Sequence, residues 1–176
     1  MTIHAEHPFI DPERVLGRQL RGRLGNRVSL WCAGDLAGTG NERPAGLTVS
    51  SCLVVPGEPW RVVGFVDPAS DLAAAIEHTG RATVALLEWQ HRGLADMFGG
   101  IAPAPGGAFR HGEFTQTAHG PRLVDATTWA ALELESTDEV GWTLQLTCRA
   151  VDIAIGPDEN PLHHTRGRYR TFDAAD

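Results

Sequence analysis

Short apolar runs, separated by segments rich in glycine and proline, follow one another along the chain, and most alternate with the period of two expected of β-strands. An early pair, Val28 to Ala33 and Gly46 to Cys52, is joined by a glycine-rich region from Gly34 to Pro44, which predicts a hairpin. A third run, Trp60 to Val66, is apolar except for Arg61. This pattern favours a strand that is buried on both faces.

Helix signals occur at three places. Asp11 before Pro12 is suited to begin a helix whose short apolar stripe reaches Leu20. Ser70 is suited to cap a helix that Gly80 ends, and a further helix is expected from Gln90 to Phe98. The segment from Ile101 to Ala108 is rich in proline and glycine and is predicted to be a loop.

The remaining strands include one with an irregular pattern. Strands are expected at Ala82 to Leu87, Trp129 to Glu135 and Trp142 to Ile155. In the last of these, the apolar phase shifts by one residue between Cys148 and Val151, as a β-bulge produces where strands bend to close a barrel. We therefore expect about six or seven strands and two or three short helices, in a mainly β, barrel-like domain with the helices packed outside. No repeat or domain boundary is visible, so residues 1–176 are predicted to form one domain with a core from about 11 to 172.

Composition excludes several kinds of chemistry. All 15 basic residues are arginine, so Schiff-base enzymes, phosphate-loop nucleotidases and Ser-x-x-Lys acylases are excluded, because each needs a lysine amine. The net charge of −7 and the scattered arginines argue against a nucleic-acid partner. The sequence has neither a signal peptide pattern nor a run of about 20 apolar residues, so we expect no membrane partner and a cytoplasmic location.

Polar groups at three places suggest a binding site. The run Thr48-Val49-Ser50-Ser51 offers hydroxyls and backbone amides to a phosphate or to the ring edge of a flavin, although an ordinary edge strand has the same pattern. The turn from Asp67 to Ser70 precedes a helix, where it either binds an anion or only caps the helix. His91, near the start of the next helix, is either a surface residue or a hydrogen-bonding group at a cofactor rim.

The C-terminal segment from His163 to Arg170 gathers two histidines, three arginines and the single tyrosine of the chain. It is either a solvated basic edge or a lid over a dinucleotide, with arginine on phosphate and a ring stacked on nicotinamide. His163 and His164 are adjacent, so on a strand they face opposite ways, and we expect no metal site.

Four motifs, taken in order, resemble the flavin reductase-like family, whose fold is an FMN-binding split barrel. The likeness runs from near Asp11 to Phe172. The motifs are the Gly-x-Thr-x-Ser-Ser strand at Gly46 to Ser51, the buried strand and Ser-containing turn at Val62 to Ser70, the Leu-Ala-x-x-Phe helix end at Leu94 to Gly100, and the Pro-Leu and Arg-Gly-x-Tyr ending at Pro161 to Tyr169.

This resemblance implies a Greek-key-like split barrel and a flavin reductase, which transfers hydride from NADH or NADPH to FMN or FAD. It also implies a homodimer and a role as the reductase component of a two-component monooxygenase. Hydride transfer depends on stacking and orientation more than on an acid or base, so no catalytic residue is expected. The resemblance assigns these residues to flavin and nicotinamide: Thr48, Val49, Ser50, Ser51, Asp67, Ser70, His91, His164, Arg166 and Tyr169.

Two positions depart from the family pattern. Members often carry Asn where this chain has Ala85 and Gln where it has His91, so two amides of the flavin environment are absent. A non-enzymatic protein that holds FMN or haem in the same barrel therefore stays open as an alternative.

Overall fold

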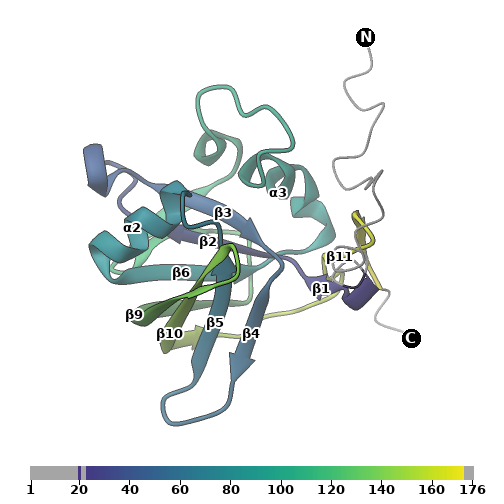
Figure 1. Cartoon of the computed structure of the whole chain (residues 1–176). Helices are drawn as coiled ribbons and strands as arrows, with labels where there is room; N and C mark the ends of the chain where they lie inside the picture. The colour runs from purple at the N-terminus through teal and green to yellow at the C-terminus, as the bar shows by residue number, and fades with distance from the viewer. Residues whose placement is uncertain (1–19, 21–22, 173–176) are drawn as a thin grey trace.

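The computed structural model describes residue 20 and residues 23–172. Its main feature is a seven-stranded, wholly antiparallel sheet that curls into a half-barrel (Figure 1), with strand order β3-β2-β6-β9-β10-β5-β4. The strands are β2 (Ser29–Ala33), β3 (Ala45–Val49), β4 (Cys52–Val55), β5 (Arg61–Val66), β6 (Arg81–Leu86), β9 (Trp129–Val140) and β10 (Thr143–Ala154). The predicted helix from Asp11 to Leu20 lies, apart from Leu20, outside the described residues.

The other elements surround this sheet. Two small antiparallel sheets consist of β1 (Asn26–Arg27), β11 (His163–Thr165) and β12 (Arg168–Arg170), and of β7 (Phe114–Thr117) with β8 (Gly120–Leu123). From residue 25 to residue 172, the helices are α2 (Asp71–Thr79) and α3 (Arg92–Phe98), with 3₁₀ turns η1 (Gly40–Glu42), η2 (Trp89–His91) and η3 (Ala108–His111).

The capping signals of α2 are confirmed. The Ser70 hydroxyl accepts a hydrogen bond from the backbone amide of Ala73 at 3.2 Å, so it is the N-cap. Gly80 ends the helix in the left-handed conformation with φ +68°, which a glycine adopts without strain. The predicted hairpin of β2 and β3 is also present.

The expected strand from Gly46 to Cys52 is in fact two strands. It ends at Val49, and Ser50 and Ser51 form a corner from which β4 starts in a new direction. Because β3 and β4 are the two outermost strands of the sheet, this two-residue corner links its opposite edges. The Phe65 amide donates to the Ser51 carbonyl at 2.9 Å, so the corner is tied to β5.

The prediction that β5 is buried on both faces is wrong for one face. Val62, Gly64 and Val66 are buried, whereas Val63 and Phe65 are only half-buried and Trp60 is 50% exposed. The inner face packs in the core, while no helix covers the outer face of β5 in Figure 1.

The bulge is confirmed. The register of β10 against β9 shifts between Thr147 and Cys148 and again between Ala150 and Asp152, which leaves Val151 unpaired. Leu146 and Cys148 before it are fully buried, whereas the apolar residues that follow it face solvent in this chain.

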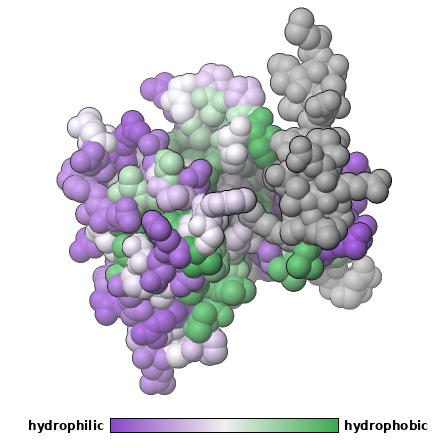
Figure 2. Space-filling view, viewed as in Figure 1, coloured by the Kyte–Doolittle hydropathy of each residue, from purple (hydrophilic) through white to green (hydrophobic). Residues whose placement is uncertain are grey.

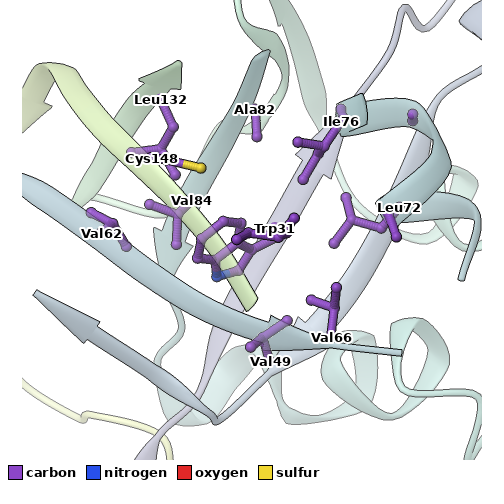
Figure 3. Close-up of a cluster of buried hydrophobic side chains, with 14 of the residues drawn as sticks. Trp31, Val49, Val62, Val66, Leu72, Ile76, Ala82, Val84, Leu132 and Cys148 are labelled. Atoms are coloured by element: carbon purple, nitrogen blue, oxygen red, sulfur yellow. The ribbon is translucent and has the colours of Figure 1, made fainter. Parts of the chain in front are cut away.

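Trp31 lies at the centre of the inner core, with no exposed surface, and Figure 3 shows Leu72 and Ile76 of α2 next to it. Gly64 makes this packing possible, because a Cβ there would lie 2.7 Å from the indole ring. The opposite face of β2 is buried as well: Leu30 and Cys32 belong to a second cluster that includes α3 residues. The half-barrel is therefore packed inside and, along β2, outside.

Candidate functional site

The corner at Ser50 and Ser51 brings two of the predicted binding segments together. Ser51 pairs with Phe65 of β5, and β5 leads two residues later into the turn that starts at Asp67. The two serines are half-buried, and within the described part of the chain the Ser50 hydroxyl makes no side-chain hydrogen bond. The hydroxyl run and the turn before α2 therefore border the same end of the half-barrel.

The turn from Asp67 to Ser70 is held by its own hydrogen bonds. The Asp67 carboxylate accepts from the Ala69 amide at 2.8 Å, and the Ser70 hydroxyl donates to the Asp67 carbonyl at 2.7 Å while it caps α2. The geometry thus shows the capping role directly. A role of Asp67 and Ser70 toward a phosphate stays a prediction.

Helix α3 packs on the outer side of β3, and Gly46 of β3 makes this close packing possible. A Cβ on Gly46 would lie 2.6 Å from the Phe98 ring, so only glycine lets the helix approach this closely. The Thr48 hydroxyl donates to the carbonyl of Ala95 at 2.7 Å and fastens the helix there. Val49 is 4% exposed and faces the inner core. The proton of the Thr48 hydroxyl is thus used by α3, which leaves its oxygen lone pairs and the Val49 backbone for the predicted flavin contact.

The hairpin of β11 and β12 reaches the same helix. The Tyr169 side chain hydrogen-bonds Asp96. Asp96 directly follows Ala95, whose carbonyl accepts the hydrogen bond from Thr48. Burial raises the pKa of Tyr169 above its ordinary value, and the Asp96 carboxylate raises it further, so the phenol keeps its proton at neutral pH. His164 lies beside Tyr169, with 5.8 Å between the ring centroids and an edge-to-face arrangement. Consecutive residues of α3 therefore connect β3 to the C-terminal hairpin.

Strand β1 anchors this hairpin from the other side. Arg27 pairs in register with His163 and forms two hydrogen bonds, of 2.7 and 2.9 Å, with the Asp158 carboxylate. This guanidinium lowers the pKa of Asp158, and burial together with Arg27 lowers the pKa of His163. His163 is thus mainly neutral at pH 7.

Arg166 occupies the turn of the hairpin with φ +51°, a conformation that non-glycine residues rarely adopt, followed by Gly167 at φ +74°. Arg166, Arg168 and Arg170 are exposed, whereas Tyr169 between the last two is half-buried. Because side chains alternate along a strand, Arg168 and Arg170 face away from the side on which Tyr169 meets α3.

His91 is not an exposed rim residue. It is 4% exposed, its Nδ1 accepts from the Glu88 amide at 3.0 Å, and its Nε2 lies 3.2 Å from the Asp125 carboxylate. Both ring nitrogens are therefore used inside the protein. A contact of His91 with a cofactor stays a prediction.

The sequence did not predict two properties of the structure, the partner of Tyr169 and the unreactive state of the cysteines. Asp96 was not recognised as the partner of Tyr169, because the two residues lie on an α-helix and a strand far apart in the chain. The free cysteines were not identified as inert: burial raises the pKa of Cys52 to about 11 and that of Cys148 to about 12, so neither is a thiolate at neutral pH.

Two general features of the described segment bear on the site. None of its helices is long and apolar enough to cross a membrane. Residue 20 and residues 23–172 also contain no group of three or more His, Cys, Asp or Glu side chains placed to hold a metal ion.

Comparisons with known proteins agree with this architecture. The family model for the flavin reductase like domain matches residues 21–173. A curated relative from Ancylobacter novellus, FMN reductase (NADH) RutF, is 30% identical over 166 residues, which cover 94% of this chain and 87% of the relative.

Solved structures share the fold. One is the NADH:FAD oxidoreductase SgcE6 of Streptomyces globisporus in complex with NAD and FAD fragments, with a TM-score of 0.80 and 20% identity over 94% of this chain and 98% of that one. Another is the styrene monooxygenase flavin reductase of Pseudomonas putida, with a TM-score of 0.77 and 22% identity over 90% and 97% of the two chains.

Proposed function

This chain belongs to the flavin reductase-like family, and from that membership we propose that it is an NAD(P)H:flavin oxidoreductase that transfers hydride from NADH or NADPH to FMN or FAD. The structural observation that carries the proposal is the meeting of β3, α3 and the C-terminal hairpin through Thr48, Ala95, Asp96 and Tyr169. A relative that covers 94% of the chain and is named FMN reductase (NADH) supports the same activity.

The residues around the corner fit a flavin. Without lysine, a flavin phosphate needs hydroxyls, backbone amides or arginine, and the turn from Asp67 to Ser70 leads into the first backbone amides of α2. The corner carries the Ser50 and Ser51 hydroxyls. The neutral donors suit the ring edge and ribityl chain. In the proposal Thr48 to Ser51 contact the ring and ribityl chain, and the turn from Asp67 to Ser70 lies on the phosphate side.

Bound flavin supplies the hydride acceptor in this chemistry. The side chains of the protein orient and enclose the flavin and the nicotinamide. The protonated Tyr169, held by Asp96, fixes the hairpin against α3, and His164 offers a ring for the nicotinamide to stack on. Because hydride transfer requires close stacking rather than proton transfer, no residue acts as an acid or base.

We propose that the active form is a homodimer. Exposed apolar side chains lie on the edge strand β4 and at the end of β10, and Figure 2 shows hydrophobic surface where Figure 1 has β4. The Ala150 amide of β10 donates to the carbonyl of Trp60, which directly precedes β5, and β5 pairs with β4. The exposed apolar residues of β4 and those at the end of β10 therefore lie on either side of β5. This apolar patch consists of Val54, Trp60, Val151, Ile153 and Ile155, each more than 40% exposed, whereas Leu53 and Val55 alternate with Val54 and face the other side of β4. A surface of this kind marks a protein interface.

The proposed partner in turn is a flavin-dependent monooxygenase that receives the reduced flavin. The styrene monooxygenase flavin reductase, whose fold this chain shares, is such a component by name. The proposed compartment is the cytoplasm, where reduced nicotinamide nucleotides are available.

A nucleotide-oxidation assay tests the proposal. Purified protein with NADH or NADPH and with FMN, FAD or riboflavin, mixed without oxygen, should bleach the 450 nm absorbance of the flavin and oxidise the nucleotide in equal amount. Oxidation at the rate of a protein-free mixture with all six pairs would reject the reductase function. An absorbance spectrum of the purified protein tests for the haem-binding alternative, because a tightly held haem gives a Soret band and a flavin does not. The FMN-binding, non-enzymatic alternative differs from the reductase in the oxidation assay.

A further inference from the structure

A surface cavity of about 290 Å³ lies outside the site described above, at the start of α3, and its volume is at the lower end of small-ligand sites. Its lining comes from two segments: Glu88, Trp89, Gln90 and Arg92 on one side and Asn160 on the other. The Trp89 amide donates to the Asn160 carbonyl at 2.8 Å, and Glu88 forms a β-bridge with the residue after Asn160. The two walls are therefore fixed relative to each other.

The side chains of this cavity combine three kinds of recognition. Trp89 is 37% exposed and offers an aromatic surface on which a base can stack. The Arg92 guanidinium lies 4.8 Å from the centre of that ring and donates one hydrogen bond to the Trp89 carbonyl at 3.0 Å, which leaves other N–H groups for a phosphate. The Glu88 carboxylate accepts from the backbone amide of His91 and keeps further lone pairs that can accept from ribose hydroxyls. The Gln90 amide nitrogen lies 3.4 Å from His91 Nε2, so its carbonyl oxygen, together with the Asn160 amide, can bond the edge of a base.

The cavity is also close to the candidate flavin site. Arg92 and Asp96 are one turn apart on α3, about 6 Å along the helix axis, and Asp96 holds Tyr169 of the hairpin. A dinucleotide carries its two bases at opposite ends of a pyrophosphate. One molecule can therefore place its reactive ring near Tyr169 and its other half in the cavity.

We propose that the cavity around Trp89 is a subsite for the adenosine monophosphate half of a dinucleotide. The inference rests on the proposed reductase function, and both FAD and NADH carry this half. The base stacks on Trp89, the ribose meets Glu88 and the phosphate meets Arg92. A carboxylate beside the ribose favours a free 2′-hydroxyl over a 2′-phosphate, so the subsite prefers NADH to NADPH if the bound dinucleotide is the nicotinamide one.

The test compares dinucleotides with the matching mononucleotides in the full-length protein. Dissociation constants are measured for FAD and FMN by fluorescence, and KM values for NADH and reduced nicotinamide mononucleotide in the oxidation assay. Trp89→Ala should raise the constant for one dinucleotide about tenfold relative to its mononucleotide, the size expected for the loss of one base stack. A rise for FAD identifies the flavin nucleotide as the occupant, and a rise for NADH identifies the nicotinamide nucleotide.

A second tryptophan provides the matched control. Trp142 is 98% exposed at the turn between β9 and β10, and Trp142→Ala should change none of the four constants. Dinucleotide-to-mononucleotide ratios that are equal in wild type and Trp89→Ala, with the same melting temperature, would overturn the subsite. Because this result needs a wild type that oxidises NADH, it is distinct from a failure of the reductase function itself, in which no pair of substrates reacts.

Discussion

Ser51 stands at the corner where the two edges of the sheet meet, and the proposed flavin site depends on its hydroxyl. Ser51→Ala should raise the dissociation constant for FMN about two- to twelvefold, because a single hydrogen bond contributes about 0.5–1.5 kcal/mol. Flavin fluorescence titration measures this change. Ser136→Ala, an exposed serine on β9, provides the control with an unchanged constant. Equal FMN affinity in Ser51→Ala and wild type would remove Ser51 from the site.

Single residues also mark the limit of sequence interpretation. The motif around Thr48 predicts a flavin contact, but it does not show that the Thr48 hydroxyl donates to the Ala95 carbonyl, because no local pattern shows which helix will cover a strand. His91 is buried because Glu88 and Asp125 satisfy its two nitrogens. Asp125 belongs to a different part of the chain, so the sequence alone did not indicate that His91 has a partner.

At the scale of elements, the contact of α3 with β3 positions the site and can be tested at Gly46. Gly46→Ala places a methyl group against the Phe98 ring, and overpacking of this kind should lower the free energy of unfolding by about 1–3 kcal/mol. Thermal or urea unfolding measures the loss, and FMN affinity should fall with it because Thr48 and Ala95 move apart.

Gly93 provides the matched glycine for that experiment. It lies on α3 with nothing within 4 Å of a Cβ, so Gly93→Ala should raise the free energy of unfolding by up to about 1 kcal/mol through helix propensity. If both substitutions shift stability in the same direction, the close approach of α3 to β3 is not what requires Gly46.

Elements with strong local signals were predictable, and those fixed by distant contacts were not. Ser70 and Gly80 bound α2 as expected, since capping depends on neighbours in sequence. The break between β3 and β4 was missed because Ser50 continues the alternation of the strand before it, and the single out-of-phase serine, Ser51, did not by itself indicate a corner. The three-residue strands β11 and β12 were also missed, since β11 pairs with β1 from the other end of the chain and β12 pairs in turn with β11.

At the scale of the whole molecule, the apolar patch on β4 and β10 predicts the assembly state. Wild type should elute as a dimer with a mass near 38 kDa, twice the 19.0 kDa of the chain. Val54→Asp combined with Ile153→Asp should give monomers, because a charge at each exposed apolar position is costly to bury in an interface. Light scattering coupled to gel filtration measures the mass.

Val140→Asp serves as the control, since Val140 is similarly exposed at the opposite end of β9 and β10 and should leave the dimer intact. A monomeric wild type at micromolar concentration would contradict the homodimer. A dimer that survives the double substitution would place the interface elsewhere.

The corner at Ser50 and Ser51 also bears on the entropy of ligand binding. The two edge strands of the sheet, β3 and β4, are consecutive in the chain, and only two residues join them. Because the connection is this short, ordering it costs close to the minimum of chain entropy. The serine backbone is already held by the β5 hydrogen bond before any ligand arrives. Recognition at this point is therefore preorganised, and little of the affinity is spent on immobilising the protein.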